Sequence, residues 1–169
     1  QATDIRMLVA KETGIPAEHI LMQALHQHTA GAVANAPSYY KESLARKYVD
    51  VVKLALDDLA ECTVTVAEKE TSEPVSFIRR YRMKDGTCRT NPGRGKGDLV
   101  SHPLDEPDNS VRFLRFTREG ADDIALINFA CHPDVIGYID PTGFSADWPG
   151  YARIHTEKAL EGVKAVLVN

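Results

Sequence analysis

Helical periodicity is strongest in two segments near the start of the chain. Residues 3–13 place apolar side chains on one side, and Gly14 supplies a stop signal. A longer helix is predicted from Ser38, an expected N-cap, to about Glu61. Its broad apolar stripe is expected to pack in the core and comprises Tyr40, Leu44, Tyr48, Val51, Val52, Ala55, Leu56 and Leu59.

Strand patterns follow this second helix. They cover residues 62–68, 75–83, 111–117, 124–131 and 163–168. Residues 111–117 and 124–131 predict a hairpin, and the second of these segments is apolar on both faces, which predicts a central strand covered on both sides. A turn is predicted at 84–86, and the Gly-, Pro- and charge-rich residues 88–108 predict a long loop that forms a lid or rim.

A histidine pair follows an apolar run near the start of the chain. The run from Ile20 to Leu25 predicts a buried strand that ends at His26 and His28. Residues two apart share one face of an extended strand, so both imidazoles are expected to reach one metal ion or one substrate atom. The alternative interpretation is a pair of ordinary polar residues at a strand end.

The order of elements predicts an α/β (α+β) domain with a mixed β-sheet flanked by helices. A loop at 134–150 and a helix at 151–161 are predicted before the last strand. Because the chain opens inside a helical pattern and ends on a buried type of strand, we expect residues 1–169 to form a single partial domain. It is expected to lack its N-terminal start and its C-terminal remainder, as part of a larger multi-layer catalytic domain.

Composition excludes some classes of protein. The 169 residues are 43% hydrophobic, enough for one domain with a core, and the mild net charge of −4 argues against a nucleic-acid surface. No apolar run reaches the roughly 20 residues of a membrane-spanning helix. Cys62, Cys88 and Cys131 show no metal-binding or disulfide spacing, so buried free thiols are expected, with Cys131 set apart by its neighbour His132.

A third histidine strengthens the chemical interpretation of the first two. His132 follows the predicted central strand, as His28 follows the opening strand, and two such strand ends converge at one edge of an α/β sheet. Three histidines at one edge predict a zinc site, because neutral imidazole is a good zinc ligand. Asp134 and Asp147 are candidates for a further ligand, with turn or cap residues as the alternative interpretation.

Four segments, taken in order, resemble one known family. They are His26–Gly31, Phe77–Tyr81, Ile127–Pro133 and Phe144–Gly150. Together they resemble the N-terminal catalytic domain of neutral/alkaline non-lysosomal ceramidases, over nearly the whole chain. The resemblance implies a zinc-dependent amidase that cleaves the N-acyl bond of ceramide to a fatty acid and a sphingoid base, with a slight preference for a secreted or periplasmic location.

The resemblance also implies a role for individual residues. His26 and His132 match zinc ligands, His28 matches a histidine that contacts the substrate or the oxyanion, and Arg79 matches an arginine that contacts the substrate or the transition state. The family's remaining zinc ligands, a Glu and a Tyr, are expected beyond this chain. The chain departs from the family motifs at Gln27, Thr29, Ala30 and Ile78, where the family has Thr, Ser, Gly and Asn. We therefore expect the rim of the substrate site to differ from that of true ceramidases.

The partners expected are therefore a lipid-like N-acyl amide substrate and the remainder of the catalytic domain, with a second copy of the chain as an open alternative.

Two other functions remain open. One is a non-catalytic domain of the same fold that binds a ligand or a partner, with structural histidines. The other is a metallohydrolase that acts on other N-acyl amides.

Overall fold

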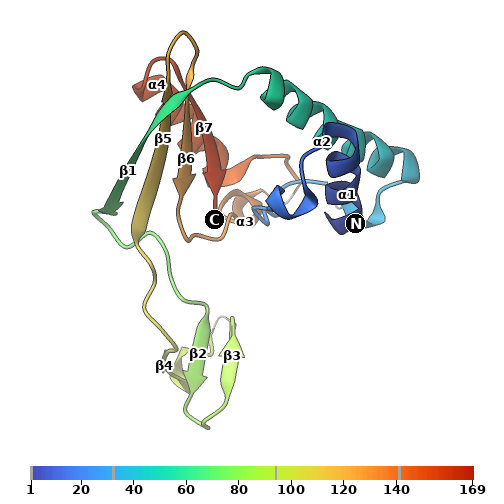
Figure 1. The fold of residues 1–169 in the computed structure, drawn as a ribbon. Coiled ribbons are helices and arrows are strands. Elements are labelled where there is room, and N and C mark those ends of the chain that lie inside the picture. The colour runs from blue at the N-terminus through green and yellow to red at the C-terminus, as the bar shows by residue number, and fades with distance from the viewer. Residues whose placement is uncertain (1, 32, 94, 141) are drawn as a thin grey trace.

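The computed structural model describes residues 2–31, 33–93, 95–140 and 142–169. It has an α+β fold with two separate sheets (Figure 1). The main sheet is four-stranded and the small sheet is three-stranded, and two extended connections join them. The predicted fold class is therefore confirmed. Within the described residues, no helix combines the length and the apolar character needed to cross a membrane.

The main sheet contains the predicted hairpin and the last strand. Its strands are β1 (Cys62–Glu70), β5 (Ser110–Arg118), β6 (Asp123–Asn128) and β7 (Val163–Val168), in the order β1-β5-β6-β7. β6 pairs antiparallel with β5 and parallel with β7, so the sheet is mixed and β6 is central, as predicted. Phe129 and Cys131, predicted as strand, lie beyond the end of β6.

One face of the main sheet is packed under helix α4 (Asp147–Ala159). The core on this face is formed by Ile127, Ala165 and Leu167, against which Phe113, Trp148 and Ala152 pack. α4 begins four positions before the predicted residue 151, because Asp147 and the residues after it form its first turn. Gly162, with φ +70°, ends the turn that leads from α4 into β7.

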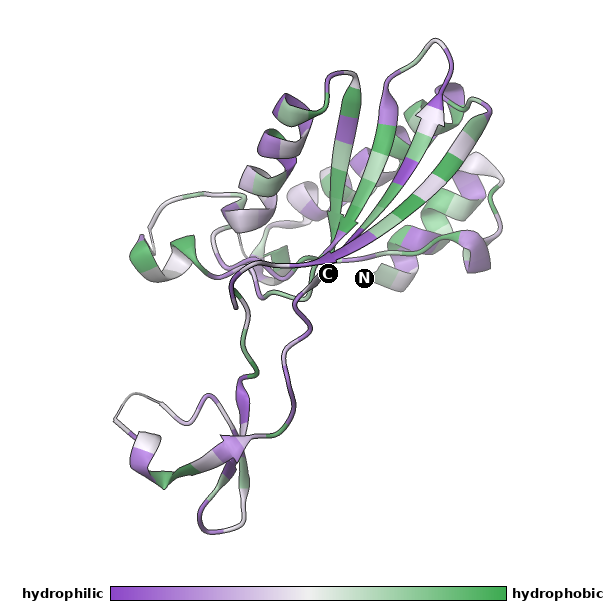
Figure 2. Ribbon diagram, turned by 90° about the vertical axis from the view of Figure 1, so that its left-hand side faces the viewer, coloured by the Kyte–Doolittle hydropathy of each residue, from purple (hydrophilic) through white to green (hydrophobic). Residues whose placement is uncertain are grey.

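Among the described residues, α4 is the helix with substantial contacts to the main sheet, and it leaves the opposite face of the sheet open. The strand register brings apolar side chains into two adjacent rows on this face: Val64, Phe116 and Ile124 in one, and Val66, Leu114, Leu126 and Val166 in the other. Val66 is 79% exposed and Val166 is 48% exposed. The prediction that the central strand is covered on both sides is therefore wrong in this structure. Figure 2 shows the hydrophobic bands that cross the strands.

The two N-terminal helices form a second, smaller core. α1 (Ala2–Thr13) packs on α2 (Ser38–Asp57) through buried Ile5, Val9 and Val49. Only this side of α2 is covered, so most of the predicted core stripe is solvent-exposed, including Leu59 just beyond the helix at 75%. The predicted cap is also wrong, because Pro37 occupies the N-cap position and makes no side-chain hydrogen bond to the helix.

The predicted long loop contains much of the small sheet. Its strands are β2 (Arg80–Met83), β3 (Cys88–Thr90) and β4 (Val100–Pro103), with a short helix η3 (Gly97–Leu99) before β4. The strand predicted from 75 to 83 is thus confined to its second half. The turn at 84–86 is confirmed, and Gly86 there has φ +81°. Short strands rich in polar residues carry too little apolar alternation to be distinguished from a loop by pattern.

The predicted opening strand does not form. Residues 20–25 belong to no helix or strand, and short helices η1 (Ala17–His19) and η2 (Val33–Asn35) lie before and after the histidine pair. Side-chain hydrogen bonds attach this segment to the end of β7: Gln23 donates to the Asn169 carbonyl at 3.1 Å, and Asn169 donates to the Leu25 carbonyl at 3.2 Å. The predicted loop at 134–150 also contains α3 (Ile136–Ile139).

Two substitutions on opposite faces of the main sheet test this asymmetry. Ile127→Ala removes a side chain from the core under α4, so we expect it to lower the free energy of unfolding by about 2–5 kcal/mol. Val66→Ala, on the open face, is expected to cost less than about 1 kcal/mol. Urea unfolding measures both, and equal losses would show that the second face is covered in solution.

Candidate metal centre

Three histidines from two distant parts of the chain meet beyond the end of β6. The ligating atoms of His26, His28 and His132 all lie within 4.8 Å of one another. The ring centroids are 4.9 Å apart for His26 and His28, 4.7 Å for His28 and His132, and 5.2 Å for His26 and His132. This spacing allows one metal ion to contact a nitrogen of each ring, so the predicted convergence is present.

The convergence does not come from a strand. His26 has φ +62°, in the left-handed region that non-glycine residues seldom adopt, and this turn of the backbone brings its ring toward that of His28. Backbone strain of this kind persists only where the surrounding structure holds it, and it concentrates at functional sites. The sequence pattern thus predicted the convergence of these histidines from a strand that does not form.

Ser145 holds the histidine segment in place. Its carbonyl oxygen accepts hydrogen bonds from the Gln27 side-chain amide at 2.6 Å and from the Thr29 hydroxyl at 2.8 Å. Its backbone N–H donates to the Thr29 carbonyl at 3.1 Å. These bonds lie on both sides of His28, and they attach the segment to the residues that precede α4.

The Asp147 carboxylate connects the start of α3 to the start of α4. The carboxylate is completely buried and accepts hydrogen bonds from the Ile136 N–H at 2.8 Å and the Trp148 N–H at 2.6 Å. Its φ of +54° is the third positive value among the described non-glycine residues, with His26 and Asn91. Because both oxygens are already engaged with backbone groups of α3 and α4, the geometry does not favour Asp147 as a further metal ligand.

Asp134 lies beside His28. Its Oδ2 atom is 3.7 Å from Nδ1 of His28, and both side chains are partly exposed. On the other side of the same ring, Nε2 of His28 is 3.1 Å from Nε2 of His132. Asp134 is therefore placed to orient His28.

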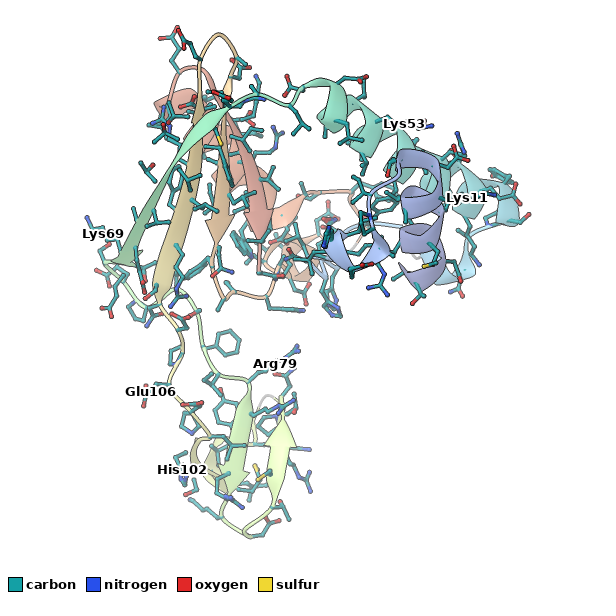
Figure 3. All side chains as sticks on the ribbon, viewed as in Figure 1. Lys11, Lys53, Lys69, Arg79, His102 and Glu106 are labelled. Carbon is teal, nitrogen blue, oxygen red and sulfur yellow. The ribbon has the colours of Figure 1, made fainter. Side chains whose placement is uncertain are left out.

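A cavity of about 270 Å³ adjoins His132. Residues of the connection to the small sheet form one wall, and the segment after β6 forms the other. The first wall includes Val75, Ser76, Phe77, Arg79 and Asn91, and the second comprises Ala130, Cys131, His132, Asp134 and Val135. Figure 3 shows Arg79 at the end of the small sheet nearest the main sheet. The structure thus brings the predicted Arg79 to the same cavity as His132, although His26 and His28 do not line it.

Electrostatics favour the neutral form of His132. Burial lowers the pKa of the His132 imidazole, and positive charge on His28 and Arg79 lowers it further. The Asp134 carboxylate acts in the opposite direction and raises this pKa, whereas His26 lowers it slightly. A neutral imidazole is the form that binds metal.

Cys131 is the cysteine next to His132 in the sequence. Burial, followed by the charge of Asp147, raises the pKa of the Cys131 thiol, which keeps it protonated. Cys131, Cys62 and Cys88 are all free, as expected, but Cys62 and Cys88 are exposed rather than buried. The three other histidines, at positions 19, 102 and 155, are exposed and lie outside the cluster.

Comparisons with protein-family models, with curated proteins and with solved structures gave no match. The functional argument for this chain therefore depends on the geometry of the cluster and cavity, together with the motifs in the sequence.

The lowered pKa of His132 predicts a pH dependence for the metal-free protein. Because the unfolded chain binds a proton at His132 more readily than the folded chain does, the contribution of this residue to stability is expected to fall as the pH drops through the folded pKa. NMR titration should give a midpoint below about 6.5, the usual histidine value. The same resonance in urea serves as the unfolded reference, and a folded midpoint at or above it would contradict the assignment.

Proposed function

We propose that this chain belongs to a zinc-dependent amidohydrolase that cleaves the N-acyl amide bond of ceramide-like lipids to a fatty acid and a sphingoid base. The observation that supports it most is the convergence of His26, His28 and His132, with ligating atoms within 4.8 Å, next to a cavity that also contains Arg79. The resemblance of four sequence segments to neutral/alkaline non-lysosomal ceramidases supports the choice of substrate.

The donor set fits zinc. Imidazole nitrogen is one of the ligands that Zn²⁺ prefers, and a catalytic zinc site commonly uses three protein ligands and keeps a further position for water. The lowered pKa of His132 keeps that ring in its ligating form. His26 and His28 are exposed, which leaves room for water and substrate.

Each residue of the site then has a role. His26 and His132 would hold the zinc ion, and the ring of His28 lies about equally close to both of them, at 4.9 Å from His26 and 4.7 Å from His132. A bound zinc ion supplies Lewis acidity and a water with a pKa of about 7. The guanidinium of Arg79 would stabilise the negative charge that develops on the amide oxygen during attack. His28 would contact the same oxygen or the substrate.

The cavity suits an amphipathic amide. Apolar side chains of Val75, Phe77 and Val135 provide contact for a hydrocarbon chain, while Ser76 and Asn91 offer hydrogen bonds to hydroxyl or amide groups. Phe77 is 76% exposed and Val75 is 58% exposed, so an entering chain would cover them. This combination supports an N-acylated lipid over a fully polar substrate.

A non-catalytic domain of the same fold is the second candidate. The open face of the main sheet and the exposed side of α2 favour it, since both would suit packing against a partner. In that case the histidines are structural. A metallohydrolase acting on other N-acyl amides is the third candidate, and it differs from the first only in substrate.

Zinc content separates the first two candidates. We expect about one zinc ion per chain in the intact protein after gel filtration, measured by elemental analysis, and loss of this zinc in His26→Ala and His132→Ala because each removes a ligand. His155→Ala is the matched control, since His155 is an exposed histidine on α4 outside the cluster. A wild-type protein without metal would contradict the proposal.

Hydrolysis assays separate the first and third candidates. We expect fatty acid to be released faster from ceramides than from simpler N-acyl amides. Arg79→Ala is expected to lower kcat/KM by about 10²–10³-fold through loss of oxyanion stabilisation. Arg89→Ala, an exposed arginine on β3 outside the cavity, should leave kcat/KM unchanged. Hydrolysis of the simple amides alone would overturn the ceramide assignment.

A further inference from the structure

The outer edge of the main sheet at β1 has no partner strand among the described residues. β1 stands first in the strand order and pairs only with β5, over nine residue pairs without a shift in register. Figure 1 shows it as the outermost strand of this sheet. Every residue of β1 is exposed. Because an edge strand is paired on one side only, the outward N–H and C=O groups of β1 are available to another strand.

The opposite edge of the sheet, at β7, is better protected. The Ala165 N–H donates to the carboxylate of Glu157 on α4 at 3.1 Å, and Asn169, directly after β7, is bonded to the segment before the histidines. β1, by contrast, contains no proline and no bulge, and its charged residues are confined to positions 68–70. Proteins normally protect a free edge with such devices. The unprotected edge of β1 therefore indicates a partner strand.

The sequence of β1 is complementary to itself in one antiparallel register. A two-fold axis perpendicular to a sheet keeps each side chain on its own face, so the axis must pass through a residue. With the axis at Thr65, Val64 lies opposite Val66 of a second copy. Lys69 then lies opposite Glu61 of the second copy, which directly precedes β1. The register thus matches apolar residues with apolar residues and opposite charges with each other.

Charge selects this register over its neighbours. Glu68 already forms an ion pair with Arg112 of β5 at 3.3 Å, whereas Glu61 and Lys69 have no ion-pair partner within the described residues of one chain. Moving the axis by one residue in either direction would place Lys69 opposite an uncharged residue. Symmetry makes the pair twice in one dimer, and directly opposite charges on adjacent strands attract.

The same register makes the apolar rows on the open face continuous. One row ends at the sheet edge with Val64 and includes Phe116, and the other ends with Val66 and includes Leu114. Since Val64 lies opposite Val66 of the second copy, each row of one chain continues into the other row of its partner. Cross-strand pairs of this kind stabilise a sheet.

We propose that the chain forms a symmetric dimer in which β1 pairs antiparallel with β1 of a second copy, with the two-fold axis at Thr65. The two four-stranded sheets then form one continuous sheet. The histidine cluster lies outside the strands of the main sheet, so this proposal does not depend on the proposed hydrolase.

Sedimentation equilibrium at low ionic strength tests the dimer through its charges. We expect the wild-type chain to dimerise and Lys69→Glu to raise the dissociation constant by about 10–50-fold, because two symmetric attractions become repulsions. Glu61→Lys should do the same. The double variant Glu61→Lys/Lys69→Glu restores opposite charges and should return the constant to near the wild-type value. Lys47→Glu, an exposed lysine on α2, is the control for net charge and should have no effect.

The outcomes of this experiment are distinct. A wild-type chain that stays monomeric would overturn the proposal and assign the edge to another segment or another protein. A dimer that Lys69→Glu weakens no more than Lys47→Glu, or that the double variant fails to restore, would overturn the proposed register. Circular dichroism checks that the exposed substitutions leave the fold intact.

A disulfide across the axis tests the register directly. Residues directly opposite in an antiparallel pair have Cα atoms about 4.5–5.5 Å apart, within the range of a disulfide. In a chain with Cys62→Ser and Cys88→Ser, which remove the exposed native thiols, Thr65→Cys should cross-link the dimer on mild oxidation. Thr63→Cys is the control, since its two copies would lie about 14 Å apart along the strands. No link at 65, or a stronger link at 63, would contradict the axis.

Discussion

The hydrogen bonds around Ser145 are the constraint on which the candidate site depends. One carbonyl oxygen accepts from the side chains of Gln27 and Thr29, so the segment with the first two histidines is held to the residues before α4. Asp147, two residues later, ties α3 to the same place through the Ile136 N–H. The positive φ angles of His26 and Asp147 indicate that this region is held in a strained conformation, which is typical of a functional site.

Apolar surface is distributed unequally in this fold. α4 covers one face of the main sheet, whereas the other face and much of α2 remain open, with Val66 and Leu59 more than 70% exposed. Monomeric proteins seldom leave contiguous apolar surface of this kind uncovered. A covering partner and the proposed catalytic role are compatible, because the open face consists of strand residues, whereas the histidines belong to segments outside the strands of the main sheet.

Much of the fold could be predicted because it depends on local patterns. The helices at 2–13 and 38–57 and the strands of the main sheet follow from the helical and alternating spacing of apolar residues, and the hairpin from the short polar turn between its arms. The small sheet could not be predicted, because its strands are short and lie among glycine, proline and charged residues. The extended run before His26 looked like a strand, but the pattern cannot show whether a neighbouring strand will pair with it.

Sequence by itself determined which residues are candidates for the site. The three histidines and the Asp134 alternative were found by residue type and by position at the ends of apolar segments, and Arg79 by the resemblance of its segment to a family motif. Only the tertiary structure decided how they are arranged: His28 lies beside Asp134, the Asp147 carboxylate accepts backbone hydrogen bonds, and burial raises the pKa of the Cys131 thiol. The physical reason is that these outcomes depend on contacts between segments about 100 residues apart, such as the contact of His28 with His132, and no periodicity in the sequence encodes such distances.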